Sequence, residues 1–339
     1  MRIRGAREHA MAEGSTLAAV AARAGVSIAS ASRALNGGIA STATIARVQQ
    51  AADDLGYRPN LMARGLQSGR TGQVAMLVPD AANPVYARMM SALQSELDAH
   101  GIRLLMQQVP AEPVDAIDAL SAGLVDGAVV VALRVTDALV RAVRRAAVPV
   151  VVLGLVEAAG IDSVRADSRS GMALLVEHLA SRGAHRVGLV VGPTDTTPGR
   201  TRLDGFVAAC RAQGVDAGLV EVAEDFTHAA ARPAARALLA RGVPDAIVAA
   251  NDAMALATLR ECATLGLRVP HDLLLAGLDD TEPAELSVPS LTSVDLGAHE
   301  RARIAARTLL ARIDGAGPSG ATAVAPRLVV RESTTEETA

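Results

Sequence analysis

Residues 16–36 read TLAAVAARAGVSIASASRALN, and this stretch decides the fold of the first part of the chain. Its apolar residues recur at helical spacing on both sides of Gly25, which supplies the backbone freedom that a tight turn needs. Ser27 is a good N-cap for the second helix. The inward-facing residues are Leu17, Val20, Ala21, Ala24, Ala31, Ala34 and Leu35. Two short helices joined in this way form either a helix-turn-helix, whose second helix enters the major groove of DNA, or a purely structural hairpin.

The next segment extends this small helical domain and then changes character. Ser41 is a suitable N-cap for a third helix over residues 42–55. The inward-facing residues of that helix are Ile45, Val48, Ala52 and Leu55. Asn60–Leu66 is too short to be helical by itself, because helix nucleation is costly and Gly65 costs about 1 kcal/mol relative to alanine. We expect a solvated linker in the free protein and a helix when this segment packs on DNA and on a second copy.

Length and composition restrict the class of protein. A chain of 339 residues is longer than one hydrophobic core usually serves, so two or more domains are expected. No apolar run reaches the roughly 18 residues that a membrane-spanning helix needs, and the N-terminus lacks the apolar segment of a signal peptide. Cys210 and Cys262 are far apart without CxxC spacing, and the seven histidines show no metal-binding motif. We therefore expect a soluble cytoplasmic protein with no metal and no cofactor.

Charge is distributed unevenly along the chain. Residues 1–70 hold nine arginines against four acidic residues, a net charge of +5, whereas the remainder has a net charge of −8. A basic first part concentrates phosphate attraction at one end of the protein. Residues 1–14 show no periodicity and hold three of these arginines, so we expect them to form a disordered tail.

From residue 72 onward, apolar β-branched runs alternate with helical patterns such as 86–100 and 170–182. Strands separated by helices indicate parallel, doubly wound sheets, and there are too many strands for one sheet. The expected strands are 73–78, 103–107, 127–131, 148–153, 186–191, 220–222, 246–250 and 273–277.

Four short motifs occur in order near the N-terminus: AGVS at 24–27, SRALN at 32–36, LGYRPN at 55–60 and ARGL at 63–66. Together they resemble the DNA-binding headpiece and hinge of the lac repressor/gal repressor family of bacterial transcription regulators. The resemblance extends over roughly residues 15–335 and implies an all-α headpiece plus a periplasmic-binding-protein-like core of two α/β subdomains. The implied parts are the headpiece at 15–59, a hinge helix or linker at 60–71, and a core at 72–335. Within the core, the N-subdomain is 72–166 and 297–325, and the C-subdomain is 167–296 and 326–335.

The family resemblance assigns base-facing positions to Ile28, Ala29 and Arg33. Arg33 can donate two hydrogen bonds to guanine O6 and N7, which is worth ~1–3 kcal/mol of discrimination between bases. Ile28 and Ala29 carry no donors, so they can only sense a thymine methyl group or exclude a base by shape, and Ile28 packing on the protein is the alternative. By resemblance, Leu66 wedges between central base pairs from the minor groove. The full set of candidate DNA-binding residues is Thr16, Leu17, Ser27, Ile28, Ala29, Ser30, Ser32, Arg33, Asn36, Tyr57, Asn60, Ala63 and Leu66.

Polar residues follow several of the expected strands in the core. PDAANPVY at 79–86 is close to the family motif Pro-Asp-x-x-Asn-Pro-Phe-Phe, and RLDGF at 202–206 opens a helix. A guanidinium, a carboxamide and a carboxylate at neighbouring strand ends suit a polyhydroxylated effector. The candidate effector-binding residues are Asp80, Asn83, Tyr86, Arg202, Asn251 and Asp279. Each can instead be a surface polar group or a helix cap, and Asn251 is equally well explained as a cap. Gly154 stands where relatives often place a polar side chain, which removes one contact.

These observations favour a sequence-specific DNA-binding regulator, most simply a repressor, that binds a near-palindromic operator in the nucleoid and is controlled by a sugar or related metabolite. The resemblance implies that residues 327–334 form the final strand, and no leucine-heptad tail follows, so we expect a homodimer. A solute-binding transport component is the second interpretation, but it does not explain the basic headpiece. An α/β enzyme is the third, and the sequence holds no GxGxxG, Walker lysine or GxSxG motif.

Overall fold

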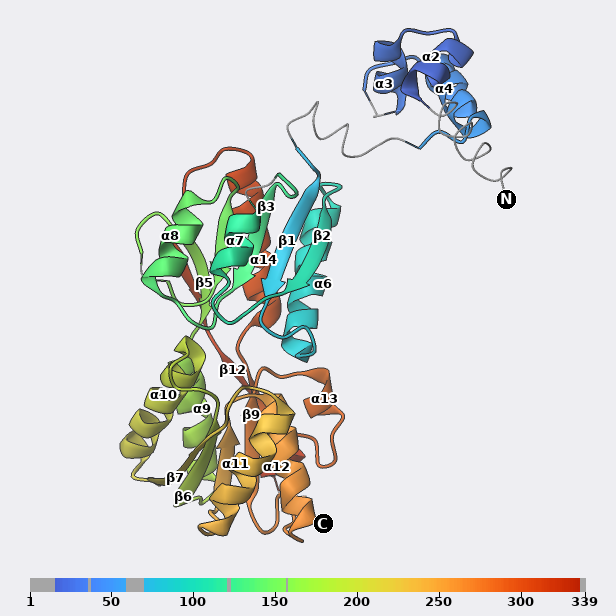
Figure 1. Ribbon diagram of the computed structural model, residues 1–339. Helices are drawn as coiled ribbons and strands as arrows, with labels where there is room; N and C mark the ends of the chain where they lie inside the picture. Colours follow the sequence, from blue (N-terminus) through green and yellow to red (C-terminus); the bar gives the residue numbers. More distant parts are fainter. Residues whose placement is uncertain (1–15, 36–37, 59–69, 121–122, 157, 336–339) are drawn as a thin grey trace, which may run out of the picture. The chain divides into compact units, whose positions relative to one another are not determined.

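The computed structural model describes residues 16–35, 38–58, 70–120, 123–156 and 158–335. The chain divides into two compact units, the first ending at Thr71 and the second beginning at Gly72 (Figure 1). The predicted tail at 1–14 and all of the predicted hinge motif at 60–66 lie outside the described residues.

The first unit is a cluster of three short helices. They are α2 (Leu17–Ala24), α3 (Ile28–Leu35) and α4 (Thr42–Asp54). The predicted N-cap at Ser41 is confirmed, because its hydroxyl accepts a hydrogen bond from the Thr44 amide at 3.2 Å. The predicted turn at Gly25 is confirmed as well, with a left-handed φ of 66°. Among the described residues of this unit, the fully buried apolar side chains are all valine or alanine: Val20, Ala21, Ala24, Ala31, Ala34, Val48, Ala51 and Ala52.

The second unit contains two six-stranded sheets, each covered by helices on both faces (Figure 1). The first sheet has the order β11-β5-β4-β3-β1-β2 and is parallel throughout. Helices α6 and α14 pack on one face, and α7 and α8 on the other. The strands are β1 (Gln73–Val78), β2 (Arg103–Gln108), β3 (Gly127–Val131), β4 (Val150–Leu153), β5 (Asp162–Ala166) and β11 (Ala321–Val324). The helices are α6 (Pro84–Asp98), α7 (Val114–Leu120), α8 (Asp137–Arg145) and α14 (Ala298–Ile313).

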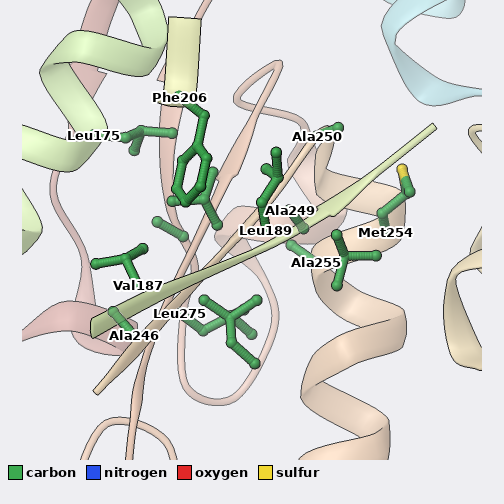
Figure 2. Packing of buried hydrophobic residues seen from close by; sticks show 14 of the residues in the cluster. Leu175, Val187, Leu189, Phe206, Ala246, Ala249, Ala250, Met254, Ala255 and Leu275 are labelled. Atoms are coloured by element: carbon green, nitrogen blue, oxygen red, sulfur yellow. The ribbon is translucent and has the colours of Figure 1, made fainter. Parts of the chain in front are cut away.

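The second sheet has the order β12-β10-β9-β8-β6-β7, and only β12 runs antiparallel. Helices α9 and α10 pack together, as do α11 and α12. Figure 2 shows how Phe206 of α10 and Leu175 of α9 join β6 side chains such as Leu189 in the core of this subdomain. The strands are β6 (Arg186–Val191), β7 (Asp216–Val222), β8 (Ala246–Ala249), β9 (Leu274–Leu278), β10 (Thr292–Asp295) and β12 (Arg327–Val329). The helices are α9 (Ser168–Ser181), α10 (Thr197–Gln213), α11 (His228–Ala240), α12 (Asp252–Thr264), α13 (Glu282–Glu285) and the 3-10 helix η1 (Glu332–Thr334).

The chain passes between the two sheets three times, after β5, after β10 and after β11. The predicted fold class, a helical headpiece plus two doubly wound parallel-sheet subdomains, is confirmed. Strands β5, β10 and β11 were not among the predicted strands, and the sequence of β5, DSVRA, lacks an apolar run.

The prediction of a final strand over 327–334 is wrong in its second half. The strand ends at Val329, and residues 332–334 form a 3-10 helix. The reason is hydrogen bonding to residues distant in sequence: the Ser333 hydroxyl donates to the Leu275 carbonyl at 2.6 Å and accepts from the Thr292 amide at 2.8 Å. Through these bonds the segment contacts the first residues of β9 and β10, and it does not pair with either strand as a further strand of the sheet.

Candidate DNA-binding surface and ligand cleft

The outer face of α3 carries a row of polar side chains. Ser27, Ser30 and Arg33 are spaced by three residues and therefore share one face of the helix. The Ser27 hydroxyl caps the helix by accepting from the Ser30 amide at 3.1 Å. The Arg33 guanidinium donates to the Ser30 hydroxyl at 3.4 Å and is otherwise exposed. This face presents a cation and hydroxyl groups to the solvent.

The remaining candidate DNA-binding residues lie in different environments. Ile28 is 55% exposed, so its side chain is not part of the headpiece core, and Ala29 is exposed beside it. Thr16 caps α2 by accepting from the Ala19 amide at 3.2 Å. Leu17 and Tyr57 pack partly against the core, and Ser32 is half-buried. Four further candidates lie outside the described residues: Asn36, Asn60, Ala63 and Leu66.

A cleft of about 450 Å³ opens at the carboxyl ends of the strands in the second unit. All six candidate effector-binding residues line it. Asp80, Asn83 and Tyr86 come from the subdomain of the first sheet, after β1. Arg202, Asn251 and Asp279 come from the subdomain of the second sheet. The ends of parallel strands meet at one edge of a sheet, which explains why segments distant in sequence gather here.

Arg202 is the most deeply buried cation of the cleft, with 8% of the residue exposed. It projects from α10, and its Nη1 donates to the Ala250 carbonyl at 2.6 Å. Its Nη2 lies 3.8 Å from a carboxylate oxygen of Asp279, and its guanidinium lies 5.8 Å from the centre of the Phe226 ring. Its buried Nε has no hydrogen-bond partner among the described residues. Arg202 therefore retains donor capacity toward the cleft.

Asp279 follows β9 in a left-handed conformation with a φ of 104°. Burial raises the pKa of its carboxyl, while the guanidinium groups of Arg202, Arg301 and Arg88 act in the opposite direction. The loop is held by Asp252, whose carboxylate accepts from the Thr281 amide at 2.7 Å and from the Ser293 hydroxyl at 2.6 Å. Asp252 thus fixes the backbone that presents Asp279.

Three of the candidates also have structural roles. The Asn251 side chain caps α12 by accepting from the Met254 amide at 2.8 Å, and it donates to the Phe226 carbonyl at 3.0 Å. Asn83 caps α6 by accepting from the Val85 amide at 3.0 Å. Asp80 accepts from the Ala82 amide at 3.0 Å. The helix-cap interpretation of Asn251 is therefore confirmed, although the residue also lines the cleft.

Tyr86 is buried, and burial followed by the nearby Asp279 charge raises the pKa of its hydroxyl. The hydroxyl is therefore a neutral donor and acceptor at the cleft.

Several polar or aromatic residues of the cleft lining were not predicted from the sequence, among them Gln108, Arg165, Phe226 and Arg301. Arg301 lies in the first turn of α14, directly after the chain crosses from β10 to the other subdomain. A residue in the first turn after a crossover faces the space between the subdomains, and this position is the signal that could have identified it. Arg165 sits on the unpredicted strand β5, so no local pattern indicated it.

Two further results limit the chemistry of the protein. No group of histidine, cysteine, aspartate and glutamate residues in the described segments could hold a metal ion. In the same segments, no helix combines the length and apolar character required to cross a membrane.

Comparison with known proteins assigns the chain to a family. Residues 16–60 match the model for bacterial regulatory proteins of the lacI family, and residues 176–334 match a periplasmic binding protein-like domain. The HTH-type transcriptional regulator MalR of Streptomyces coelicolor is 33% identical over 337 residues, covering 94% of this chain and 96% of that protein.

Solved structures agree with this assignment. The lac repressor dimer bound to operator and the anti-inducer ONPF has a TM-score of 0.83 and 27% identity, covering 95% of this chain and 99% of that one. The CelR–cellobiose complex has a TM-score of 0.70 and 32% identity, covering 94% and 99%. The chain belongs to the lacI family of bacterial regulatory proteins. It is a DNA-binding transcriptional regulator, and the relatives compared are regulators rather than enzymes.

Proposed function

We propose that this regulator is a repressor that binds a near-palindromic operator as a homodimer, and that a carbohydrate in the cleft controls its affinity for DNA. The observation that carries the proposal is the pair Arg202 and Asp279, buried at the cleft with polar atoms not committed to other groups. No cofactor is required, and the cytoplasmic chromosome is the site of action.

The cleft has the size and chemistry expected of a sugar site. Its volume of about 450 Å³ is within the usual range for small-molecule pockets. Asp279 accepts and Arg202 donates strong charge-assisted hydrogen bonds, which suit hydroxyl groups. The rings of Tyr86 and Phe226 supply apolar surface for the faces of a sugar. Among relatives, CelR has been solved with cellobiose, and other relatives are repressors of the ribose operon.

Control of DNA binding follows from the two-sided lining of the cleft. A ligand that contacts both subdomains binds most tightly when they close on it, so it shifts the population toward the closed arrangement. The usual coupling between two such sites is ~1–3 kcal/mol, which changes operator affinity about 5- to 150-fold.

At the DNA, we propose that Arg33, Ile28 and Ala29 read bases from the major groove. The hydroxyl groups of Thr16, Ser27, Ser30 and Ser32, with the helix N-terminus at Leu17, hold phosphates. Tyr57 supports the chain where it leaves the headpiece. The proposed contacts of Asn36, Asn60, Ala63 and Leu66 rest on sequence motifs, because these residues lie outside the described part of the structure.

The homodimer is supported by an exposed sheet edge. Strand β2 forms one edge of the first sheet, and its apolar Leu105 and Met106 are 46% and 40% exposed. Unpaired edge strands with apolar side chains are normally covered by another chain. The lac repressor, a structural relative, was solved as a dimer.

The test begins with a binding-site selection, in which the full-length protein enriches an operator sequence from a pool of random duplex DNA. Fluorescence anisotropy then measures the dissociation constant of that operator with and without each member of a sugar panel. We expect one class of sugar to change the constant by fivefold or more, and the affinity to fall steeply with salt, by a slope of about −0.9 per phosphate contact. Selection that enriches no sequence would refute the operator proposal, and an unresponsive constant would refute the control by sugars.

A further inference from the structure

The cleft holds more hydrogen-bond donors than the protein itself uses. One terminal nitrogen of Arg202 donates to the Ala250 carbonyl, and the other lies 3.8 Å from a carboxylate oxygen of Asp279. The buried Nε of Arg202 has no hydrogen-bond partner in the described segments. An unpartnered buried donor is costly, so its persistence indicates that a ligand supplies the acceptor.

Arg301 is a second partly satisfied cation close to the same carboxylate. Its Nε donates to the Leu296 carbonyl at 3.0 Å, and the side chain makes no other hydrogen bond or ion pair with the described residues. Burial lowers the pKa of its guanidinium, with Asp279 opposing and Arg202 reinforcing the effect. Two terminal nitrogens of Arg301 therefore remain available at the cleft, which it lines from α14.

The nearby carboxylates are already committed to other groups. Asp295 accepts from the Gly297 amide at 2.8 Å and lies 3.6 Å from Arg327. Asp280 pairs with Arg331 at 2.8 Å. Asp279 is the carboxylate of the described cleft lining that lies within ion-pair distance of Arg202, and the Arg301 side chain makes no ion pair with the described residues. Both guanidinium groups therefore keep hydrogen-bonding capacity for an anion.

The carboxylates of the outer lining form no ion pair with Arg202 or Arg301 in the described part of the chain. Asp80 and Asp225 line the cleft, but each accepts from a backbone amide of its own loop, at 3.0 Å and 2.8 Å. Arg165 also lines the cleft, and its side chain makes no hydrogen bond and no ion pair with the described residues. A neutral sugar would leave Arg165 and Arg301 without an ion-pair partner among the described residues.

Building on the proposed control of the regulator by a carbohydrate, we propose that the effector is anionic: a sugar acid or a sugar phosphate. Arg202 and Arg301 hold its anionic oxygens, and Asp279 and Tyr86 accept and donate to its hydroxyl groups. The planar guanidinium fork matches both a carboxylate and a phosphate, so the shared chemistry is a polyhydroxylated body bearing one such group.

Isothermal titration calorimetry of the full chain tests this inference with matched compounds. The probes are D-glucose against D-glucuronate and D-glucose 6-phosphate, and D-ribose against D-ribose 5-phosphate. We expect the anionic member of at least one set to bind tenfold or more tightly than its neutral counterpart. Comparison of the uronate with the phosphates identifies which anionic group is bound.

Three variants identify the charge responsible. Arg301→Met removes a cleft cation and should abolish most of the preference for the anionic compound. Arg301→Lys keeps the positive charge and should retain a weakened preference. Arg200→Met removes an exposed cation from the same helix as Arg202 and should keep the full preference. Thermal unfolding of each variant establishes that it is folded.

Several outcomes would overturn the inference. A neutral sugar that binds as tightly as its anionic counterparts and changes operator affinity leaves the proposed sugar control standing but refutes the anionic effector. A preference that survives in Arg301→Met, or is lost equally in Arg301→Lys, refutes the assigned role of Arg301. If no compound binds, the anionic effector and the sugar control both fail.

Discussion

The candidate DNA-binding face of the headpiece and the cleft of the second unit are built in opposite ways. The face lies on one short helix, and its Ser27, Ser30 and Arg33 are within seven consecutive residues and largely accessible. The cleft collects side chains from both subdomains and buries Arg202 and Asp279. An exposed residue can be changed without disturbing its neighbours, whereas a buried charge is coupled to every group around it.

The largest expected effect is at the cleft. Arg202→Met removes the buried guanidinium and leaves Asp279 with one opposing cation fewer. We expect effector affinity to fall about 100-fold or more, on the order of 3 kcal/mol. The measurement is the effector concentration that gives half of the maximal change in operator binding. The protein should also be less stable to urea, because a buried carboxylate is left poorly paired.

Adding Asp279→Asn to Arg202→Met separates the two consequences of that change. The double variant should recover part of the lost stability, since the unpaired carboxylate is gone, but it should not recover effector binding. Arg200→Met serves as the exposed control. Equal stability of the single and double variants would show that the two buried charges are not coupled.

The next effect concerns pH. Burial and the Asp279 charge raise the pKa of Asp252 to about 7 despite its hydrogen bonds from Ser293 and Thr281. The folded state therefore holds a proton that the unfolded state releases near its ordinary value of 3.8. The contribution of Asp252 to the free energy of unfolding is therefore fully present below pH 3.8 and is lost as the pH rises toward about 7. The loss between pH 5 and pH 7 is on the order of 2 kcal/mol.

Urea unfolding at a series of pH values checks this prediction against Asp252→Asn. The variant should be less stable overall, because it loses acceptors for the Thr281 loop, but its stability should fall less between pH 5 and pH 7. The headpiece gives the contrast: Gln50 and Arg23 lower the pKa of the exposed Asp54, so its contribution is lost as pH falls. An unchanged pH slope in the variant would contradict the role of Asp252.

A smaller effect is expected at the DNA face. Arg33→Ala should relax base preference at one position of each half-site, worth ~1–3 kcal/mol, because bidentate donation to guanine is lost. Ser32→Ala should weaken binding to all sequences alike. Binding-site selection with each variant distinguishes the two outcomes, and a full retained preference in Arg33→Ala would end that assignment.

The smallest expected effect is on the headpiece itself. Gly25→Ala places a side chain at a φ of 66°, where the space is open but the left-handed conformation is strained, so the cost should be ~1 kcal/mol. Ala22→Gly, at an exposed position of α2, is a matched control for helix propensity, with a similar cost of ~1 kcal/mol. Thermal unfolding of the full chain should show both losses. A stable Gly25→Ala protein would mean that the turn has other accessible geometries.

Prediction from sequence succeeded where the evidence was local. The turn at Gly25, the cap at Ser41 and most strands of the core were predicted at close to their observed bounds. These features depend on residues only a few positions apart, so periodicity and capping rules suffice. Strand β5 and the 3-10 helix at 332–334 were missed because contacts to distant strands determine them.

The residues of the candidate site show the same distinction between local and long-range information. By itself, the sequence determined that the first part of the chain is a basic helical headpiece, that the rest is a doubly wound α/β core, and that polar residues follow the strand ends. Only the tertiary structure decided which side chains come together in the cleft. Arg301 and Arg165 were not predicted from any motif, yet they line the cleft with Arg202. Helical periodicity is encoded in neighbouring residues, whereas a cleft exists only after distant segments have packed together.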